Sequence, residues 1–317
     1  MAAEATLRQG WNHDHDGDES MTDLTIYKRM PEWSAETLPQ GFRRKHNTKE
    51  GTWAQLTVHA GALRFTHLDA DDEELSSRVI DTSSGPQLVE PGVWHKVEPL
   101  DDALRCQLAF LCEPSRYLEK KHGLTAPHSE VRAVLPALEA APGRSVLDLG
   151  SGRGRNSFFL AEHGFTVTAV DRSETAIETL RKIQADEGFA LSSSVYDISR
   201  ASLAEVLDGG IVDHVICTVV FQFLEGARVH AVIDDMQAVT RRGGLHLIVA
   251  PVTSVEVPCP IAFPGVFQRG ELRDRYRGWE ILRYEETLGE FHKRDEHGDR
   301  YKAEFATLVA RKPEGRV

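Results

Sequence analysis

One stretch constrains this chain more than any other, a glycine-dense turn between a buried strand and a helix. It reads Ser145-Val-Leu-Asp-Leu-Gly-Ser-Gly-Arg-Gly-Arg-Asn-Ser157 and is followed by Thr166-Val-Thr-Ala-Val-Asp171. Glycines leave no Cβ atom against a ligand that lies on the backbone, and they permit the positive φ of a tight turn. The amide donors of the following helix point to the same place. Asp171, at the end of the second strand, can accept from both hydroxyls of a ribose, so the pattern predicts a nucleoside site.

The turn does not match the dinucleotide pattern G-x-G-x-x-G, because Arg155 stands where the third glycine is needed. Asp148, just before the turn, would repel a diphosphate and attract an amine or a sulfonium. A turn whose glycines serve tightness alone is the alternative interpretation. The run instead resembles the first motif of class I S-adenosylmethionine (SAM) methyltransferases, D/E-x-G-x-G-x-G. This resemblance implies SAM as the cofactor and makes a dinucleotide-dependent reductase the weaker hypothesis.

Composition limits the partners. With 317 residues the chain has room for two domains. Its net charge of −12, from 37 basic and 49 acidic side chains, argues against nucleic acid or an anionic membrane as partner. Its four cysteines show no metal or disulfide spacing, and no segment is apolar enough to span a membrane. We therefore expect a cytoplasmic protein; the sequence does not indicate an oligomeric state.

Two segments with different patterns follow a polar stretch, residues 1–20, which we expect to be a disordered tail. Residues 21–113 contain short alternating runs with Gly, Asp and Pro turns, which predict a small antiparallel β-sandwich. The predicted strands are residues 52–58, 62–67, 87–89 and 104–110. Residues 114–128 are interpreted as a linker, with a short helix from 117 to 124.

Residues 129–317 alternate strands with helices, which predicts an α/β fold with a parallel sheet covered on both faces. The predicted strands are residues 145–149, 166–170, 191–196, 212–218 and 244–250, and a final antiparallel pair at 279–286 and 305–311. The predicted helices are residues 128–138, 157–162, 174–187, 201–207 and 228–240. The last pair would complete a Rossmann-like, seven-stranded methyltransferase sheet.

Ligands of such sheets bind at the carboxyl ends of the strands, where the strand order reverses. Asp197 follows the third strand and can accept from the adenine amino group, while Ile198 packs on the ring; an N-cap of the next helix is an equal alternative for Asp197. Thr218 and Val219 follow the fourth strand, where we prefer pocket lining to plain core. The predicted cofactor-binding residues are Asp148, Gly150, Gly152, Arg155, Asn156, Asp171, Arg172, Asp197, Ile198, Thr218, Val219, His128 and Tyr117.

From Tyr117 onward the chain resembles the TehB-type tellurite-resistance methyltransferases. The resemblance rests on several blocks in the same order, among them Tyr117-Leu-Glu-Lys-Lys-His-Gly-Leu-Thr125, His128-Ser-Glu-Val131, Thr218-Val-Val-Phe-Gln-Phe-Leu-Glu225 and Gly289-Glu-Phe-His-Lys-Arg-Asp295. Residues 21–113 resemble the cupin-like domain of the long members. The family is implied to methylate tellurite, and selenite, to volatile products. A methyltransferase for a thiol or halide and a non-catalytic SAM-binding sensor are the alternatives.

The resemblance implies that His292 and Arg300 act on the methyl acceptor, and Lys293 adds positive charge. An imidazole can be a base or a donor near neutral pH, and a guanidinium fits an oxyanion. The alternative for each is solvated surface, because they lie in a charged stretch. His128 is expected near the ligand, with Ser129 as the helix cap.

The chain departs from the family at Gln222, where Met is usual, and at Phe263-Pro-Gly-Val-Phe-Gln268, where the lid usually carries another aromatic residue and a lysine. In residues 21–113, the fragment Pro91-Gly-Val-Trp-His95 looks like part of a second cupin motif. The first motif is missing, so we expect no metal and a structural or oligomerising role for this domain.

Overall fold

The computed structural model describes residues 24–207 and 210–315. The predicted tail, residues 1–20, lies outside them. The described chain divides into two compact units, the first ending at Gly123 and the second beginning at Leu124. This division falls within residues 114–128, which were predicted as the linker.

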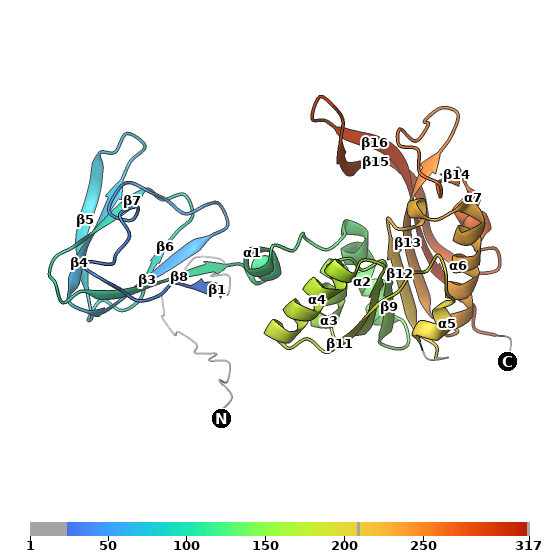
Figure 1. Ribbon diagram of the computed structural model, residues 1–317, viewed down its shortest axis with the longest axis horizontal. Coiled ribbons are helices and arrows are strands. Elements are labelled where there is room, and N and C mark those ends of the chain that lie inside the picture. Colours follow the sequence, from blue (N-terminus) through green and yellow to red (C-terminus); the bar gives the residue numbers. More distant parts are fainter. Residues whose placement is uncertain (1–23, 208–209, 316–317) are drawn as a thin grey trace, which may run out of the picture. The chain divides into compact units, whose positions relative to one another are not determined.

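The first unit consists of two antiparallel sheets, as the alternating pattern predicts (Figure 1). One has the order β1-β8-β3-β6, with β2 also paired to β8, and the other has the order β5-β4-β7. The strands are β1 (Thr25–Arg29), β2 (Trp33–Ser34), β3 (Trp53–Ala60), β4 (Ala62–Leu68), β5 (Glu74–Asp81), β6 (Gln87–Val89), β7 (His95–Pro99) and β8 (Arg105–Cys112). One hydrophobic cluster unites them, with Leu56 and Leu108 from one sheet and Phe65 and Val97 from the other. A short turn η1 (Pro114–Arg116) and helix α1 (Tyr117–His122) end the unit.

The second unit is a doubly wound α/β fold. Its sheet has the order β11-β10-β9-β12-β13-β16-β15, with β14 paired to β13 as an eighth strand. The strands are β9 (Ser145–Leu149), β10 (Thr166–Asp171), β11 (Leu191–Val195), β12 (His214–Thr218), β13 (Leu245–Thr253), β14 (Phe267–Gln268), β15 (Glu280–Arg294) and β16 (Arg300–Arg311). Six of them, β9 to β14, are joined by parallel pairing, and β16 is antiparallel to both of its neighbours. The seven-stranded methyltransferase sheet is therefore confirmed.

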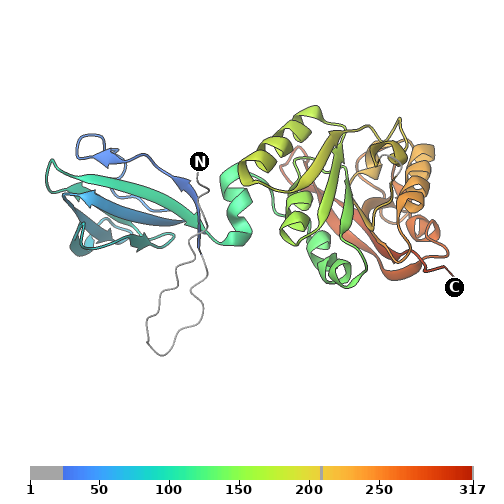
Figure 2. The same cartoon turned by 90° about the horizontal axis from the view of Figure 1, so that it is seen from below.

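Helices cover both faces of this sheet. α2, α3 and α4 lie along one face, and α5, α6 and α7 lie along the other (Figures 1 and 2). The helices are α2 (Ser129–Ala140), α3 (Arg155–Glu162), α4 (Glu174–Glu187), α5 (Leu203–Val206), α6 (Gly226–Val239) and α7 (Glu271–Asp274), with a short turn η2 (Phe221–Phe223). In α4 the buried side chains Ile177, Leu180 and Ile183 recur at helical spacing, which fixes the face that packs on the sheet. None of the helices in the described part of the chain is long and apolar enough to cross a membrane.

The final hairpin is much longer than predicted. β15 continues from Glu280 to Arg294, and the chain reverses only at residues 295–299. The prediction ended this strand at residue 286 and was wrong there. A register shift between Glu290 and Arg294 marks the irregular end of the ladder. As a result, His292 lies on a strand rather than in a turn.

Candidate functional site

Two cavities adjoin at the carboxyl ends of the parallel strands, where the strand order reverses between β9 and β12. The smaller cavity, about 180 Å³, is lined by Gly150, Val170, Asp171, Arg172, Tyr196, Asp197, Ile198, Val219, Val220, Phe223 and Leu224. The larger cavity, about 640 Å³, is lined by Leu124, Thr125, Gly150, Ser151, Gly152, Arg153, Arg155, Asn156, Thr218, Val219, Gln222, Phe223, Ile261, Phe263, Phe291, His292 and Lys293. They share Gly150, Val219 and Phe223, so one extended ligand can occupy both. This is the position at which doubly wound sheets bind nucleotides.

The three glycines of the turn have positive φ angles of 76°, 55° and 90° at Gly150, Gly152 and Gly154. Their surroundings differ. A Cβ atom on Gly150 would lie 2.3 Å from Val220, and one on Gly154 would lie 2.9 Å from Leu180. A Cβ atom on Gly152 would meet no atom within 4 Å. Only Gly152 therefore keeps the backbone open for a ligand, while the other two allow the turn to pack against its neighbours.

Asp171 links the turn to the end of β10. Its carboxylate accepts from the backbone N–H of Gly152 at 2.8 Å and from that of Ser173 at 2.8 Å. It lines the smaller cavity and is partly exposed, so its remaining lone pairs face the place where a ribose was predicted. The guanidinium of Arg172 lies over the Phe223 ring, 5.8 Å from its centroid, and closes one wall of the same cavity.

Asp197 and Ile198 both line the smaller cavity, as the strand-end rule predicts. Asp197 accepts from the backbone N–H of Ser199 at 2.9 Å and pairs with Arg200 at 3.3 Å. The N-cap of α5 is Ser202. The alternative interpretation of Asp197 as the helix cap is therefore wrong.

Asp148 is buried beneath the turn and is 1% exposed. Its carboxylate accepts from the Ser157 hydroxyl at 2.5 Å, and it is not among the described residues that line either cavity. Burial raises the pKa of Asp148 from 3.8 to about 6. The Ser157 hydrogen bond and the charge of Arg155 lower this pKa and so partly offset the effect of burial. Any effect of this acid on a cationic ligand is thus exerted through the turn rather than by contact.

A chain of hydrogen bonds joins α2, α3 and β12 at the larger cavity. Asn156 donates through Nδ2 to the Thr218 hydroxyl at 3.2 Å and accepts at Oδ1 from the backbone N–H of His128 at 2.9 Å. His128 is itself the N-cap of α2, since its Nδ1 accepts from Glu130 at 3.2 Å. The prediction that Ser129 caps this helix was wrong. Asn156 and Thr218 line the larger cavity, whereas His128 is not among the described residues that line either cavity.

Val219 has a strained backbone. Its φ is 59°, a region that a β-branched residue rarely adopts. Its N–H donates to the carbonyl of Val249 at 2.7 Å, which holds this geometry at the end of β12. Val219 lines both cavities. Strain of this kind persists where the surrounding structure determines it, often at functional sites.

His292 and Lys293 bring the end of β15 to the larger cavity, together with Arg155 from α3. Arg155 is partly buried, and loss of solvent lowers its pKa although Asp148 opposes the shift. Arg300 was predicted as a third acceptor-side residue, but it is absent from the described lining of this cavity. It begins β16, and its guanidinium lies 3.9 Å from Glu290.

Sequence reasoning missed an aromatic row along the larger cavity. Phe263 contacts Phe223 and Phe291, with ring centroids 5.7 and 5.4 Å apart, and Phe291 contacts Phe305 at 4.9 Å. The predicted lid segment supplies Phe263 to this row. Such rings exclude water from the wall of a site and hold β15 against the lid segment.

Gln222 also lines the larger cavity and is 2% exposed. Its Nε2 donates to the carbonyl of Val219 at 2.9 Å, whereas its Oε1 is buried and has no hydrogen-bond partner in the described chain. A carbonyl cannot donate, so this bond fixes the amide orientation and leaves an acceptor unused. The departure from Met at this position was the available sequence signal.

Tyr117 belongs to α1 in the first unit, where its hydroxyl accepts from Lys121 at 2.7 Å. Its predicted contact with the cofactor stays a prediction. Among the described residues, no group of three His, Cys, Asp or Glu side chains is placed to hold a metal ion.

The fold and this site are those of a class I SAM-dependent methyltransferase. The seven-stranded sheet, the open glycine turn and the acid at the end of β10 are the features that define the class. The chain belongs to the TehB family. The family model described as tellurite resistance protein TehB matches residues 110–309, and that of the TehB-like domain matches residues 28–108.

Relatives of known sequence and structure agree with this assignment. The chain is 41% identical over 290 residues to a Haemophilus influenzae protein named "Probable S-adenosyl-L-methionine-dependent methyltransferase TehB", covering 92% of this chain and 99% of that one. The crystal structure of TehB from the same species has a TM-score of 0.76 and covers 91% of this chain and 98% of its own. A protein of Eikenella corrodens named hemagglutinin 1 is 40% identical over 80% of this chain and 82% of its own.

Proposed function

We propose that this methyltransferase methylates tellurite, and also selenite, to volatile products, and so gives resistance to tellurite. The observation that carries this proposal is the convergence of His292, Lys293 and Arg155 on the larger cavity, beside the glycine turn. Three groups that are cationic or can become so, gathered in a chain of net charge −12, suit a small anion. The family membership supports the same acceptor.

The two cavities divide the binding task. Asp171, Asp197 and Ile198 would hold the adenosine in the smaller cavity, and the methionine end would pass Gly152 into the larger one. When bound, SAM would supply a methyl group on a positively charged sulfur, which a lone pair on tellurium or selenium can attack while the bond from sulfur to the methyl group breaks and S-adenosylhomocysteine leaves. Because the methylated product is still an oxyanion, a volatile product also requires a cellular reductant that removes its oxygen atoms. About 640 Å³ leaves room for a small oxyanion beside the methionine end.

The residues of the larger cavity have separate tasks on the acceptor. Lys293 and Arg155 would bind and orient the oxyanion by charge-assisted hydrogen bonds. The His292 imidazole would hold or release a proton at an acceptor oxygen.

An acceptor screen with methyl-labelled SAM tests the proposal, with tellurite, selenite, a thiol and a halide compared by label transferred to a methylated product, and by volatile label once a reductant is added. We expect label from tellurite and selenite. Volatile label from the thiol or the halide alone would show that this compound, and not tellurite or selenite, is the methyl acceptor. SAM binding without transfer to any acceptor would indicate a sensor instead.

A pair of histidine variants tests the site. His292→Ala should lower turnover by at least about tenfold while SAM affinity stays within a few-fold, because the imidazole acts on the acceptor. His297→Ala is the matched control, since His297 lies in the turn of the same hairpin and its side chain pairs with the exposed Glu296, at 3.6 Å. Equal turnover in the two variants would place His292 outside the chemistry.

A further inference from the structure

The first unit contains a cavity of about 270 Å³, and all of its lining residues belong to this unit. It is lined by Tyr27, Trp33, Leu38, Phe42, His46, Asn47, Thr48, Lys49, Thr52, Ala54, Leu56, Phe65, Val89, His95, Val97, Leu108 and Phe110. Protein cores are packed as densely as organic crystals and seldom hold voids larger than a water molecule. A cavity of this size, within the hydrophobic cluster that unites both sheets, is therefore much larger than an ordinary packing defect.

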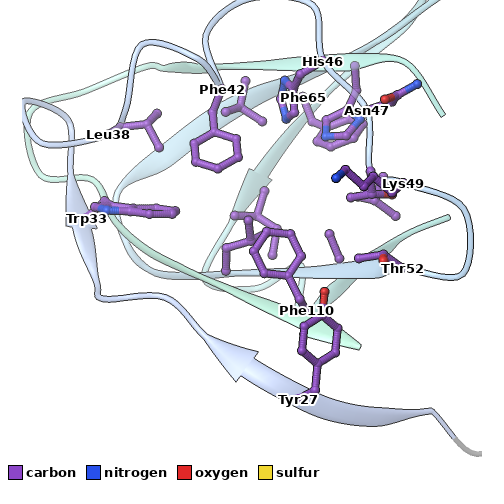
Figure 3. Close-up of a pocket in the computed structure, with 17 residues that line it drawn as sticks. Tyr27, Trp33, Leu38, Phe42, His46, Asn47, Lys49, Thr52, Phe65 and Phe110 are labelled. Atoms are coloured by element: carbon purple, nitrogen blue, oxygen red, sulfur yellow. The ribbon is translucent and has the colours of Figure 1, made fainter. Parts of the chain in front are cut away.

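Most of the wall is aromatic or aliphatic. Phe42 and Phe110 point toward one another from opposite sides, and Trp33 and Leu38 form one end (Figure 3). Trp33 contacts Phe42 with ring centroids 5.2 Å apart, which fixes the orientation of both rings. A wall of this kind suits the flat face of an aromatic ligand.

The polar groups of the cavity gather at the other end, where Figure 3 shows His46, Asn47 and Lys49 close together. His95 lies beside His46, with ring centroids 4.1 Å apart, and stacks on Phe65 at 5.1 Å with an interplanar angle of 12°. The backbones of His46 and His95 also bond to each other, N–H to carbonyl, at 3.0 and 2.9 Å. The two imidazoles are thus held as a rigid pair.

Both imidazoles present an acceptor. His46 Nδ1 lies 2.9 Å from the carbonyl of Arg44, and His95 Nδ1 lies 2.8 Å from that of Val93. A carbonyl only accepts, so each Nδ1 carries the hydrogen and each Nε2 keeps a lone pair. Burial lowers the pKa of His95 to about 4 and also lowers that of His46, which keeps both rings neutral at pH 7. The described chain gives neither Nε2 a hydrogen-bond partner.

We propose that this cavity binds a neutral aromatic molecule whose hydroxyl or amine group donates a hydrogen bond to His46 or His95. An apolar cavity of about 150 Å³ holds benzene, so 270 Å³ suits a ligand of roughly ten non-hydrogen atoms. The first unit is then a small-molecule binding domain attached to the enzyme. This inference does not depend on the acceptor of the methyltransferase.

Calorimetry on the full chain with 1-naphthol and naphthalene tests the inference. Both have the required size, and only naphthol donates a hydrogen bond. We expect naphthol to bind about tenfold more tightly than naphthalene, the usual difference for one buried hydrogen bond. Absence of naphthol binding at its solubility limit would overturn the proposal.

Two substitutions localise the binding. Ala54→Leu places a larger side chain in the cavity and should weaken naphthol binding by at least about tenfold. Ala60→Leu is the matched control at the end of the same strand, outside the lining, and should bind within about twofold of the unchanged protein. Unaltered binding by a folded Ala54→Leu variant would overturn the proposal.

If Ala54→Leu does not fold, His46→Phe and His95→Phe decide the question, since each keeps an aromatic ring but lacks the Nε2 acceptor. The double variant, which lacks both acceptors, should bind naphthol and naphthalene equally. A preference for naphthol that survives in the double variant would show that the imidazoles are not the acceptors and would overturn the proposal.

Discussion

A Cβ atom on Gly150 would lie 2.3 Å from Cγ2 of Val220, whereas one on Gly152, two residues further, would meet open space. Gly150→Ala should therefore destabilise the fold by about 2 kcal/mol or more, since a steric overlap adds to the cost of positive φ. Gly152→Ala should cost only the φ term, about 1–2 kcal/mol. Because Gly152 lines the larger cavity, its variant should nevertheless lose SAM affinity by at least about tenfold.

Gly164→Ala is the control for the cost in stability of placing alanine at a positive φ. Gly164 has a φ of 79° and equally open surroundings, but it lies in the turn after α3, outside both cavities. Urea unfolding should give similar stabilities for the Gly152 and Gly164 variants, and calorimetry should show weaker SAM binding only for Gly152→Ala. Equal SAM affinities would remove Gly152 from the ligand site.

Arg300 and Lys293 should differ although both were predicted to face the acceptor. Lys293 lines the larger cavity, while Arg300 is beside Glu290 at the start of β16. Lys293→Ala should raise KM for tellurite by about tenfold, the cost of one charge-assisted hydrogen bond. Arg300→Ala should leave KM and kcat within about twofold, because an exposed ion pair contributes little. A larger increase in KM for Arg300→Ala than for Lys293→Ala would show that Arg300 reaches the acceptor.

Part of the predicted cofactor side follows from the sequence. Asp171, Asp197 and Ile198 follow directly from the rule that ligands sit at the carboxyl ends of parallel strands, and all three line the smaller cavity. The prediction of Asp148 as a contact failed, since a glycine motif does not reveal which of its side chains turns inward to Ser157.

The acceptor side could not be predicted from local patterns. Arg300 was assigned to the acceptor through the family resemblance, and that role stays a prediction, although Arg300 is absent from the described lining of the larger cavity. The turn of the last hairpin was expected too early, before the irregular register between Glu290 and Arg294. The aromatic row joins Phe223, Phe263 and Phe291 from three distant segments, and such contacts have no local signal. In the first unit, β5 was missed because its residues are almost all exposed and do not alternate.

Burial of Asp148 predicts a pH dependence of stability. Its pKa is about 6 in the folded chain against 3.8 ordinarily, so the folded state binds this proton more tightly than the unfolded state does. The resulting stability is fully present below pH 3.8 and is lost as the pH rises through 6. Relative to Asp148→Asn, the unchanged protein should therefore lose about 2.4 kcal/mol between pH 4 and 7 in urea unfolding.

Asp197→Asn is the control with the opposite sign. Hydrogen bonds from Ser199 lower the pKa of Asp197, so its stabilisation is present above its ordinary pKa and is lost as the pH falls. The difference between the unchanged protein and this variant should thus shrink toward acid. If the free energies of unfolding of the unchanged protein and Asp148→Asn differ by the same amount from pH 4 to 7, Asp148 does not titrate as a buried carboxyl.

The strained backbone of Val219 predicts a reversal of the usual order of alanine and glycine. Both substitutions remove the side chain from the cavities, but only glycine relieves a φ of 59°, which costs an L-residue about 1–2 kcal/mol. Val219→Gly should therefore be about 1 kcal/mol more stable than Val219→Ala. Val220 has a φ of −113°, so there the alanine variant should be more stable than the glycine variant, as is usual. Thermal unfolding of the four variants checks this, and the same order at both positions would mean that Val219 carries no strain.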